Sequence, residues 1–262
     1  MIIDFHTHAF PEKIVKKAID ILTHNAATIP FTDGTVEGLV ERADSNGIDY
    51  SVVLNIATNV TQQKSVNDFA IELDKHEKII SFGSVHPFSE NALSELERLK
   101  AAGIKGVKMH PDYQGFFVDD PKTFPVYEKI SELGLIMVFH AGLDLGVYSP
   151  MHCPPERLKK ALPVFNGSPV VAAHFGGFEA WYSVEEHLVG EDLYFDTSYC
   201  YGRMPYRHAE KIMKAHGSDR ILFGSDMPWS GVHHELNFVR AFAEGEDLEK
   251  ILCLNARKLL NI

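Results

Sequence analysis

The chain has 262 residues, of which 45% are hydrophobic and 23% are charged, an ordinary balance for a globular protein with a sizeable core. Its formal net charge of −11 argues against a general nucleic-acid-binding surface and against binding to an anionic membrane. The three cysteines lie far apart, and we see no signal sequence and no transmembrane run, so we expect a cytoplasmic protein without disulfides.

Short apolar runs alternate with helical patterns along the whole chain. The expected strands cover residues 2–5, 50–54, 79–85, 104–109, 135–139, 170–173, 193–195 and 221–223. The expected helices cover residues 12–22, 36–45, 62–76, 89–102, 121–133, 235–242 and 248–260.

This alternation predicts an α/β fold with a parallel sheet and helices packed outside it. Eight strands in 262 residues favour a closed (β/α)8 TIM barrel, which typically has about 250 residues, and we expect one domain over residues 1–262. An open doubly wound sheet is the runner-up, but such sheets usually carry a glycine-rich loop where this chain has His6-Thr7-His8. Because two helices precede the second strand, residues of about 10–34 are expected to form an insertion that covers part of the barrel mouth.

Metal-binding residue types stand at the ends of several expected strands. His6 and His8 are two residues apart on a strand, so their side chains point to the same side. His140, His174 and Asp226 each follow another apolar run, and the carboxyl ends of barrel strands carry the active site. We therefore predict that these side chains converge on one divalent metal ion. Imidazole suits zinc, iron or nickel, and an added carboxylate also allows manganese.

The alternation of faces along each strand supports this convergence. Val138 shares a face with His140, and Ala172 is expected to share one with His174. Polar residues that follow strands can also serve only to anchor loops. For four of them, this interpretation and a role in the site are equally open: Asn55, His86, Asp196 and Ser198.

These motifs together resemble the amidohydrolase superfamily. Within it, the match is closest to the amidohydrolase-related group that includes aminocarboxymuconate semialdehyde decarboxylase. The resemblance runs from residue 2 to residue 260, although the chain is shorter than the decarboxylases of this group usually are. The motifs that carry it are IDFHTH at 3–8, GVKMHP at 106–111, VFHAG at 138–142, HFGG at 174–177, LFGSDMPW at 222–229 and NARKLL at 255–260.

The resemblance implies one metal ion, most often zinc, with manganese, iron(II) and nickel as other possibilities. Its ligands would be His6, His8, His140 and Asp226. Asp226 would also lie near the metal-bound water, and His174 would lie beside that water, as acid/base or as an extra ligand.

Lys108 ends the fourth expected strand, where other superfamily members use a carboxylated lysine to bridge two metal ions. The resemblance favours an uncarboxylated lysine here and leaves the bridging role open. Lys108 and His110 are then candidates for contact with the substrate at the barrel mouth.

Aromatic residues are frequent in the loops after the fifth to eighth strands, where they either pack the loops or form a wall for a planar substrate. They are Tyr148, Trp181, Tyr182, Tyr199, Tyr201 and Trp229. Arg203 would clamp a carboxylate of the substrate. The substrate-binding candidates are thus Lys108, His110, Arg203 and Trp229.

The first functional hypothesis is a metal-dependent hydrolase of a small molecule, in which Asp226 or His174 takes a proton from the metal-bound water that attacks a carbonyl-type centre. The alternative is non-oxidative decarboxylation of an aromatic or unsaturated carboxylic acid, in which protonation of a ring or alkene carbon precedes loss of CO₂. A non-catalytic metal-binding barrel is a third hypothesis, which the complete ligand set argues against. The pattern of the last helix fits packing on its own barrel and packing in a homodimer equally well.

Overall fold

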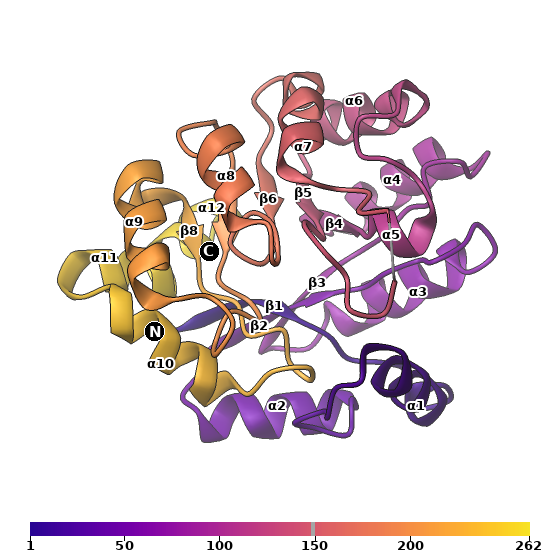
Figure 1. Ribbon diagram of the computed structural model, residues 1–262. Coiled ribbons are helices and arrows are strands. Elements are labelled where there is room, and N and C mark those ends of the chain that lie inside the picture. Colours follow the sequence, from indigo (N-terminus) through magenta and orange to yellow (C-terminus); the bar gives the residue numbers. More distant parts are fainter. Residues whose placement is uncertain (148–149) are drawn as a thin grey trace.

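Parallel strands of the computed structural model follow one another in chain order, and helices surround them (Figure 1). The structure describes residues 1–147 and 150–262. One sheet contains β1 (Ile3–Thr7), β2 (Tyr50–Leu54) and β3 (Ile79–Phe82). The other contains β4 (Gly106–Met109), β5 (Ile136–Phe139), β6 (Val170–Ala172), β7 (Tyr194–Asp196) and β8 (Ile221–Leu222).

Backbone hydrogen bonds join the two sheets at both seams. The N–H of Gly83 donates to the carbonyl of Gly106 (3.0 Å), and the N–H of Lys108 donates to that of Gly83 (2.8 Å). At the other seam, the N–H of Phe5 donates to the carbonyl of Phe223 (2.8 Å). The strands therefore form the predicted (β/α)8 TIM barrel, with β1 beside β8.

The helices lie between successive strands or extend the chain at its end. The α-helices are α1 (Val15–Ala26), α2 (Val36–Ser45), α3 (Gln63–Leu73), α4 (Ala92–Ala101), α5 (Pro111–Gln114), α6 (Phe124–Glu132), α7 (Pro155–Ala161), α8 (Trp181–His187), α9 (Tyr206–His216), α10 (Val232–Phe242), α11 (Gly245–Glu249) and α12 (Asn255–Leu260). The 3-10 turns are η1 (Pro121–Thr123), η2 (Leu162–Phe165) and η3 (Ser218–Arg220), and η4 (Lys250–Leu254) is a π-helical turn.

The predicted helix at 36–45 and strand at 50–54 match the structure to the residue. The predicted strand at 79–85 is too long, since β3 ends at Phe82. After it, backbone N–H groups that could donate to a neighbouring strand donate to side chains of α3 instead. Asn67 accepts from the N–H of Ser84 (2.8 Å), and Gln63 accepts from the N–H of His86 (2.9 Å). The predicted helix at 248–260 is divided into α11, η4 and α12, and α7, α8 and α9 were not predicted as separate helices.

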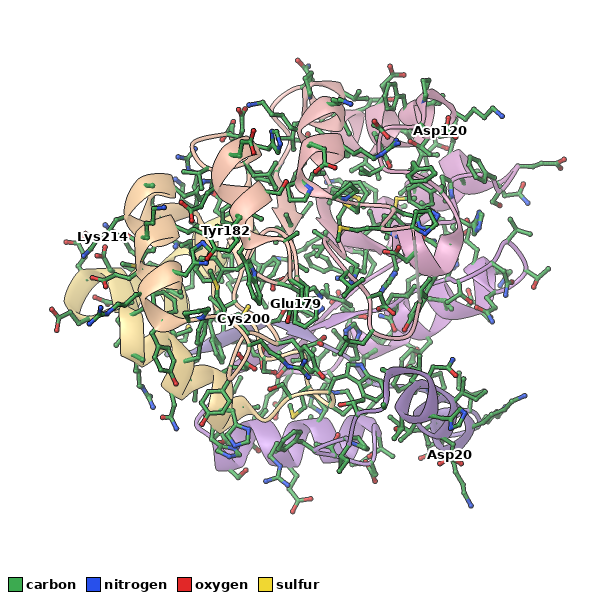
Figure 2. The ribbon with its side chains drawn as sticks, in the orientation of Figure 1. Asp20, Asp120, Glu179, Tyr182, Cys200 and Lys214 are labelled. Carbon is green, nitrogen blue, oxygen red and sulfur yellow. The ribbon has the colours of Figure 1, made fainter. Side chains whose placement is uncertain are left out.

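Side chains fill the barrel and the layer between strands and helices (Figure 2). Phe5, Leu54, Val138, Val171 and Leu222, from strands around the barrel, form one buried cluster in its interior. A larger cluster lies between the strands and the surrounding helices. In the described residues, no helix combines the length and apolar character needed to cross a lipid bilayer.

Candidate metal centre

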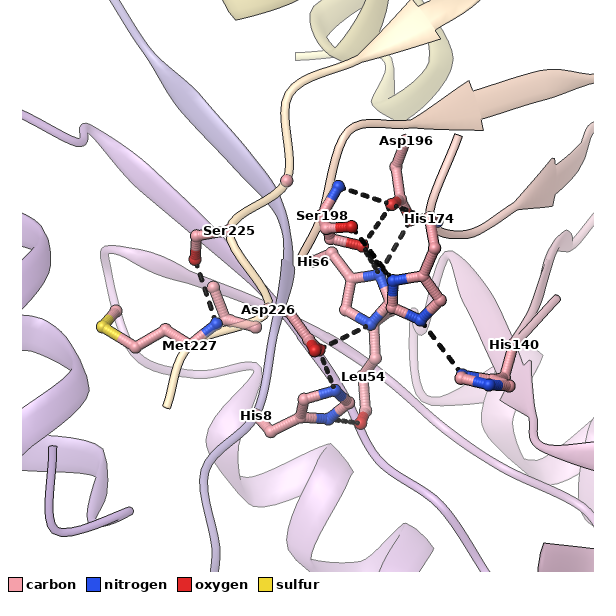
Figure 3. Close-up of polar contacts among 12 residues, drawn as sticks. His6, His8, Leu54, His140, His174, Asp196, Ser198, Ser225, Asp226 and Met227 are labelled. Atoms are coloured by element: carbon pink, nitrogen blue, oxygen red, sulfur yellow. Dashed lines mark hydrogen bonds and ion pairs between the residues drawn. The ribbon is translucent and has the colours of Figure 1, made fainter. Parts of the chain in front are cut away.

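Three of the predicted metal ligands meet at the adjacent carboxyl ends of β1 and β8 (Figure 3). Nε2 of His8 lies 3.1 Å from Oδ1 of Asp226, and Nε2 of His6 lies 3.3 Å from the same oxygen. Asp226 has a left-handed backbone, with φ of 66°, and its N–H donates to the carbonyl of His6 (2.8 Å). This rarely adopted conformation is of the kind that concentrates at functional sites.

The lone pairs of these three donor atoms point towards one another. Nδ1 of His8 lies 2.9 Å from the carbonyl oxygen of Leu54, which can only accept, so in the neutral ring Nδ1 carries the proton. Nδ1 of His6 lies 2.8 Å from Oδ2 of Asp196, which likewise leaves Nε2 of His6 unprotonated. Two imidazole nitrogens and a carboxylate oxygen thus converge, and a proton or a cation has to lie among them. This donor set fits a divalent metal ion.

The surroundings of His6 and Asp226 favour the unprotonated state of both side chains. Burial, together with the charge of Lys108, lowers the pKa of His6 to about 4. Burial would raise the pKa of Asp226, but the hydrogen bond with His8 and the charge of His6 outweigh it and hold this pKa below its usual range. His6 therefore presents a neutral imidazole and Asp226 an ionised carboxylate near pH 7, which are the forms that bind metals.

Asp196 at the end of β7 organises the back of the site. Its Oδ2 contacts His6, and its Oδ1 accepts from the backbone N–H groups of His174 (3.0 Å) and Ser198 (3.1 Å). Burial would raise the pKa of Asp196, but the charge and hydrogen bond of His6 hold it well below the usual range. Sequence reasoning left Asp196 and Ser198 between site and loop packing, and the structure places both against the histidines.

His174 reaches the site through an irregular backbone rather than through strand alternation. Its φ is 59°, and its Nδ1 lies 3.1 Å from the carbonyl oxygen of Ser198, so Nδ1 carries the proton. Ala172 packs on the outer cluster, whereas Val171 faces the barrel interior. The prediction that Ala172 and His174 share an inward face is therefore wrong, because the left-handed turn redirects the chain after β6.

His140, predicted as the fourth ligand, lies in a neighbouring group of donor atoms with His110 and Asp144. Its Nδ1 lies 3.0 Å from Nε2 of His174, and its buried Nε2 has no hydrogen-bond partner in the described part of the chain. Because Nε2 of His174 is the acceptor in this pair, Nε2 of His140 carries a free lone pair. That atom is available to a metal ion or to a substrate.

His110 and Asp144 form a fixed pair beside His140. The N–H of Tyr113 donates to Nδ1 of His110 (3.3 Å), so Nε2 of His110 carries the proton and faces Oδ2 of Asp144 at 3.2 Å. The ring of His110 stacks on that of His140 with centroids 4.0 Å apart, and burial lowers the pKa of both rings. Sequence reasoning missed Asp144, which stands in a loop four residues after His140 and belongs to no periodic pattern.

Lys108 projects from β4 into the barrel and is almost fully buried. Its Nζ lies 3.4 Å from Nε2 of His6, and burial lowers the pKa of the lysine to about 8. A lysine so placed can bind an anionic substrate group or stabilise negative charge at the floor of the site.

A cavity of about 1060 Å³ opens above these residues. Its lining includes α1, which confirms that the insertion after β1 covers part of the barrel mouth. The predicted site residues that line it are His6, His8, Lys108, His110, His140, His174, Asp226 and Trp229.

Arg203 was also predicted to contact the substrate, but it is not among the described residues that line the cavity. Its side chain is exposed, and its guanidinium lies 5.5 Å from the ring centre of Tyr199 and 5.9 Å from that of Phe178. Arg203 therefore contacts the outside of two aromatic residues that line the cavity.

The predicted aromatic wall is only partly formed. Tyr199 and Trp229 line the cavity. Trp181 is buried behind it and donates its Nε1–H to the carbonyl of His174 (3.1 Å), whereas Tyr182 is 83% exposed. Tyr201 is also exposed and stacks on a histidine of α10, and Tyr148 lies outside the described residues.

A barrel with histidines and an aspartate at the ends of β1, β5, β6 and β8 defines a class of metal-dependent enzymes. The amidohydrolase family model matches residues 3–262, so the chain belongs to this family and is an enzyme. No curated protein matches the chain significantly.

Solved structures of the same fold match the chain over nearly its full length. An uncharacterised TIM-barrel protein from Bordetella bronchiseptica is 20% identical with a TM-score of 0.78, and the match covers 99% of this chain and 98% of that one. A 2,6-dihydroxybenzoate decarboxylase from Rhizobium is 16% identical with a TM-score of 0.72, covering 99% and 98% of the two chains. A dihydroxybenzoic acid decarboxylase from Polaromonas, with bound manganese and the inhibitor 2-nitroresorcinol, is 18% identical with a TM-score of 0.70, covering 99% and 96%.

Proposed function

We propose that this protein is a metal-dependent decarboxylase of aromatic or unsaturated carboxylic acids. The single observation that carries this proposal is the full-length similarity to two decarboxylases of dihydroxybenzoic acids, together with a site of the required chemistry. These similarities favour decarboxylation over the hydrolysis that was the first hypothesis from the sequence. In the reaction the carboxylate leaves as CO₂, its bonding electron pair stays on the carbon, and that carbon takes up one proton.

His6, His8 and Asp226 would hold the metal ion, with His140 as the fourth ligand through its unpartnered Nε2. When bound, the ion would supply positive charge that holds and polarises the oxygen atoms of the substrate. Manganese and zinc both suit this donor set.

His174 is the group best suited to move the proton. Its Nδ1 is fixed by Ser198, and its Nε2, which receives a hydrogen bond from His140, belongs to a ring that lines the cavity. Asp226 is held as a carboxylate, which suits a ligand and a base better than an acid. We therefore assign metal binding to Asp226 and proton transfer to His174. The neutral ring would first take up a proton at Nε2, in place of the hydrogen bond from His140, and then pass it to the carbon that loses the carboxylate.

Other cavity residues would bind and orient the acid. Lys108 would contact its oxygen atoms at the floor. His110, whose Nε2–H faces Asp144, would line the site beside the substrate. Tyr199 and Trp229 would flank a planar ring.

The test uses metal-loaded protein and a panel of hydroxybenzoates and unsaturated acids in D₂O, with CO₂ measured in the headspace. The expected result is CO₂ release with one deuterium at the carbon that lost the carboxylate. Hydrolysis of esters or amides by the same protein, with no CO₂ from any acid, would instead establish the hydrolase.

A further inference from the structure

Helix α1 turns an apolar face towards the cavity. Ile14, Ala18, Ile21 and Leu22 line the cavity and are spaced so that they share one side of the helix and of the residue before it. No residue of α1 is buried, and Ile14 and Ile21 are 51% and 47% exposed. Apolar side chains left half-exposed over a cavity are a feature of ligand-binding surfaces.

The adjoining part of the same apolar stripe attaches α1 to the rest of the chain. The side chains of Val15 and Ile19 lie against Gly34, where an added Cβ would come within 2.5 Å of Ile19. Asp20 lies on the outer edge of α1, away from the barrel (Figure 2). The apolar stripe of α1 therefore continues from the contact at Gly34 to the cavity, and that contact sets its position over the cavity.

The facing wall of the cavity is also partly apolar. Val66 and Phe69 of α3 line it, together with Leu54 at the end of β2 and Ile56 after it. Figure 1 shows α1 beside α3 at one edge of the barrel mouth. The cavity thus has a polar floor of histidines, Lys108 and aspartates, and an apolar extension between two helices.

The size of the cavity exceeds what a single small ring needs. Drug-sized ligands occupy pockets of about 300–1,000 Å³. At about 1060 Å³, this cavity would leave most of its volume to water if it held only a hydroxybenzoate. Water against the exposed side chains of Ile14 and Ile21 would be displaced favourably by an apolar group.

We propose that the substrate carries an apolar substituent of several carbon atoms, which lies between α1 and α3 while its carboxylate lies on the polar floor. This inference rests on the proposed decarboxylase and names its substrate class: carboxylic acids with a hydrocarbon tail. The reaction at the floor is unchanged, because the tail takes no part in the loss of CO₂.

The experiment measures binding to metal-loaded protein by calorimetry, using 2-nitrophenol and its 4-alkyl and 5-alkyl derivatives from ethyl to hexyl. The nitro group replaces the carboxylate and cannot leave as CO₂, so binding is measured without turnover. Each methylene that becomes buried is expected to tighten binding about threefold to fourfold, and the hexyl compound should bind at least tenfold more tightly than the parent.

Two variants locate the tail. Ile21→Gln should remove most of the gain from the tail and leave the affinity for unsubstituted 2-nitrophenol unchanged. Leu93→Gln is the matched control, because Leu93 of α4 is exposed to 42%, close to the value for Ile21, and does not line the cavity. Thermal unfolding of both variants checks that they fold.

Equal affinity for all tail lengths, or an equal gain in wild type and Ile21→Gln, would overturn the proposed tail site. The decarboxylase is tested separately, by CO₂ release from the corresponding alkylated hydroxybenzoates. Failure of CO₂ release with tail-dependent binding intact would remove the reaction and keep the apolar subsite. If CO₂ is released and neither its release nor binding depends on the tail, the decarboxylase is kept and the apolar subsite is removed.

Discussion

Nε2 of His8 and Oδ1 of Asp226 lie 3.1 Å apart, although the neutral His8 ring already donates its proton to the carbonyl of Leu54. The pair is therefore stable only with a proton or a cation between the two atoms. Nε2 of His6 approaches the same oxygen at 3.3 Å and adds a third donor.

His8→Ala and Asp226→Asn should each reduce metal affinity at least 100-fold, because each removes one of three converging donor atoms. Elemental analysis after dialysis, and competition with a chelator, would measure the loss. Asp20→Asn is the control, since Asp20 is an exposed carboxylate on the outer side of α1. Retention of one full equivalent of tightly held metal by both site variants would show that the ion binds elsewhere.

Asp196→Asn should weaken metal binding by about 10- to 100-fold without removing a ligand. The carboxylate holds the proton on Nδ1 of His6, and an amide could present its NH₂ group there and favour the wrong tautomer. Asp196 also accepts from the N–H groups of His174 and Ser198, so the free energy of unfolding should fall as well. Chelator competition and urea unfolding separate the two effects, and unchanged metal affinity in a destabilised variant would limit Asp196 to a structural role.

His174→Asn should lower kcat by about 10²- to 10⁴-fold while one equivalent of metal stays bound. The reason is that His174 is assigned to the proton and not to the ion. The measurement is CO₂ release with the best acid of the panel, alongside metal content. Loss of metal together with activity would instead make His174 a ligand, the other role that the sequence left open.

Much of this site could be read from the sequence because strand alternation is regular. His6 and His8 share a side of β1, and His140 follows Val138 of the barrel interior, as a repeat of two requires. The closed barrel follows from the same alternation of strands and helices. These patterns predict where side chains point only where the backbone is a regular strand or helix.

The parts that the sequence did not reveal lie where the backbone is irregular. His174 and Phe175 have φ of 59° and 57°, and non-glycine residues in this region carry no reliable sequence signal. Asp144 stands in a loop, where no periodicity indicates which way a side chain points. Arg203 was predicted at the substrate, but its loop places it on the outer side of Tyr199.

The buried His216, outside the metal site, is expected to make the protein less stable at acid pH. Nδ1 of His216 accepts from the N–H of Gly190 (3.2 Å), and its Nε2–H donates to the carbonyl of Leu193 (2.9 Å). Burial lowers the pKa of His216 to about 4 in the folded protein, against an ordinary value of about 6.5. Its neutral form is therefore favoured by folding, and protonation would cost the Gly190 hydrogen bond.

Because the unfolded chain binds this proton more readily, the stabilising contribution of neutral His216 is complete above about pH 6.5 and is lost as the pH falls towards 4. The loss should be about 1–3 kcal/mol across that range. His216→Gln keeps a donor and an acceptor but does not titrate, so its free energy of unfolding should depend less steeply on pH between 6.5 and 4. Urea unfolding at several pH values tests this, and parallel curves for the two proteins would show that His216 does not contribute to the acid sensitivity.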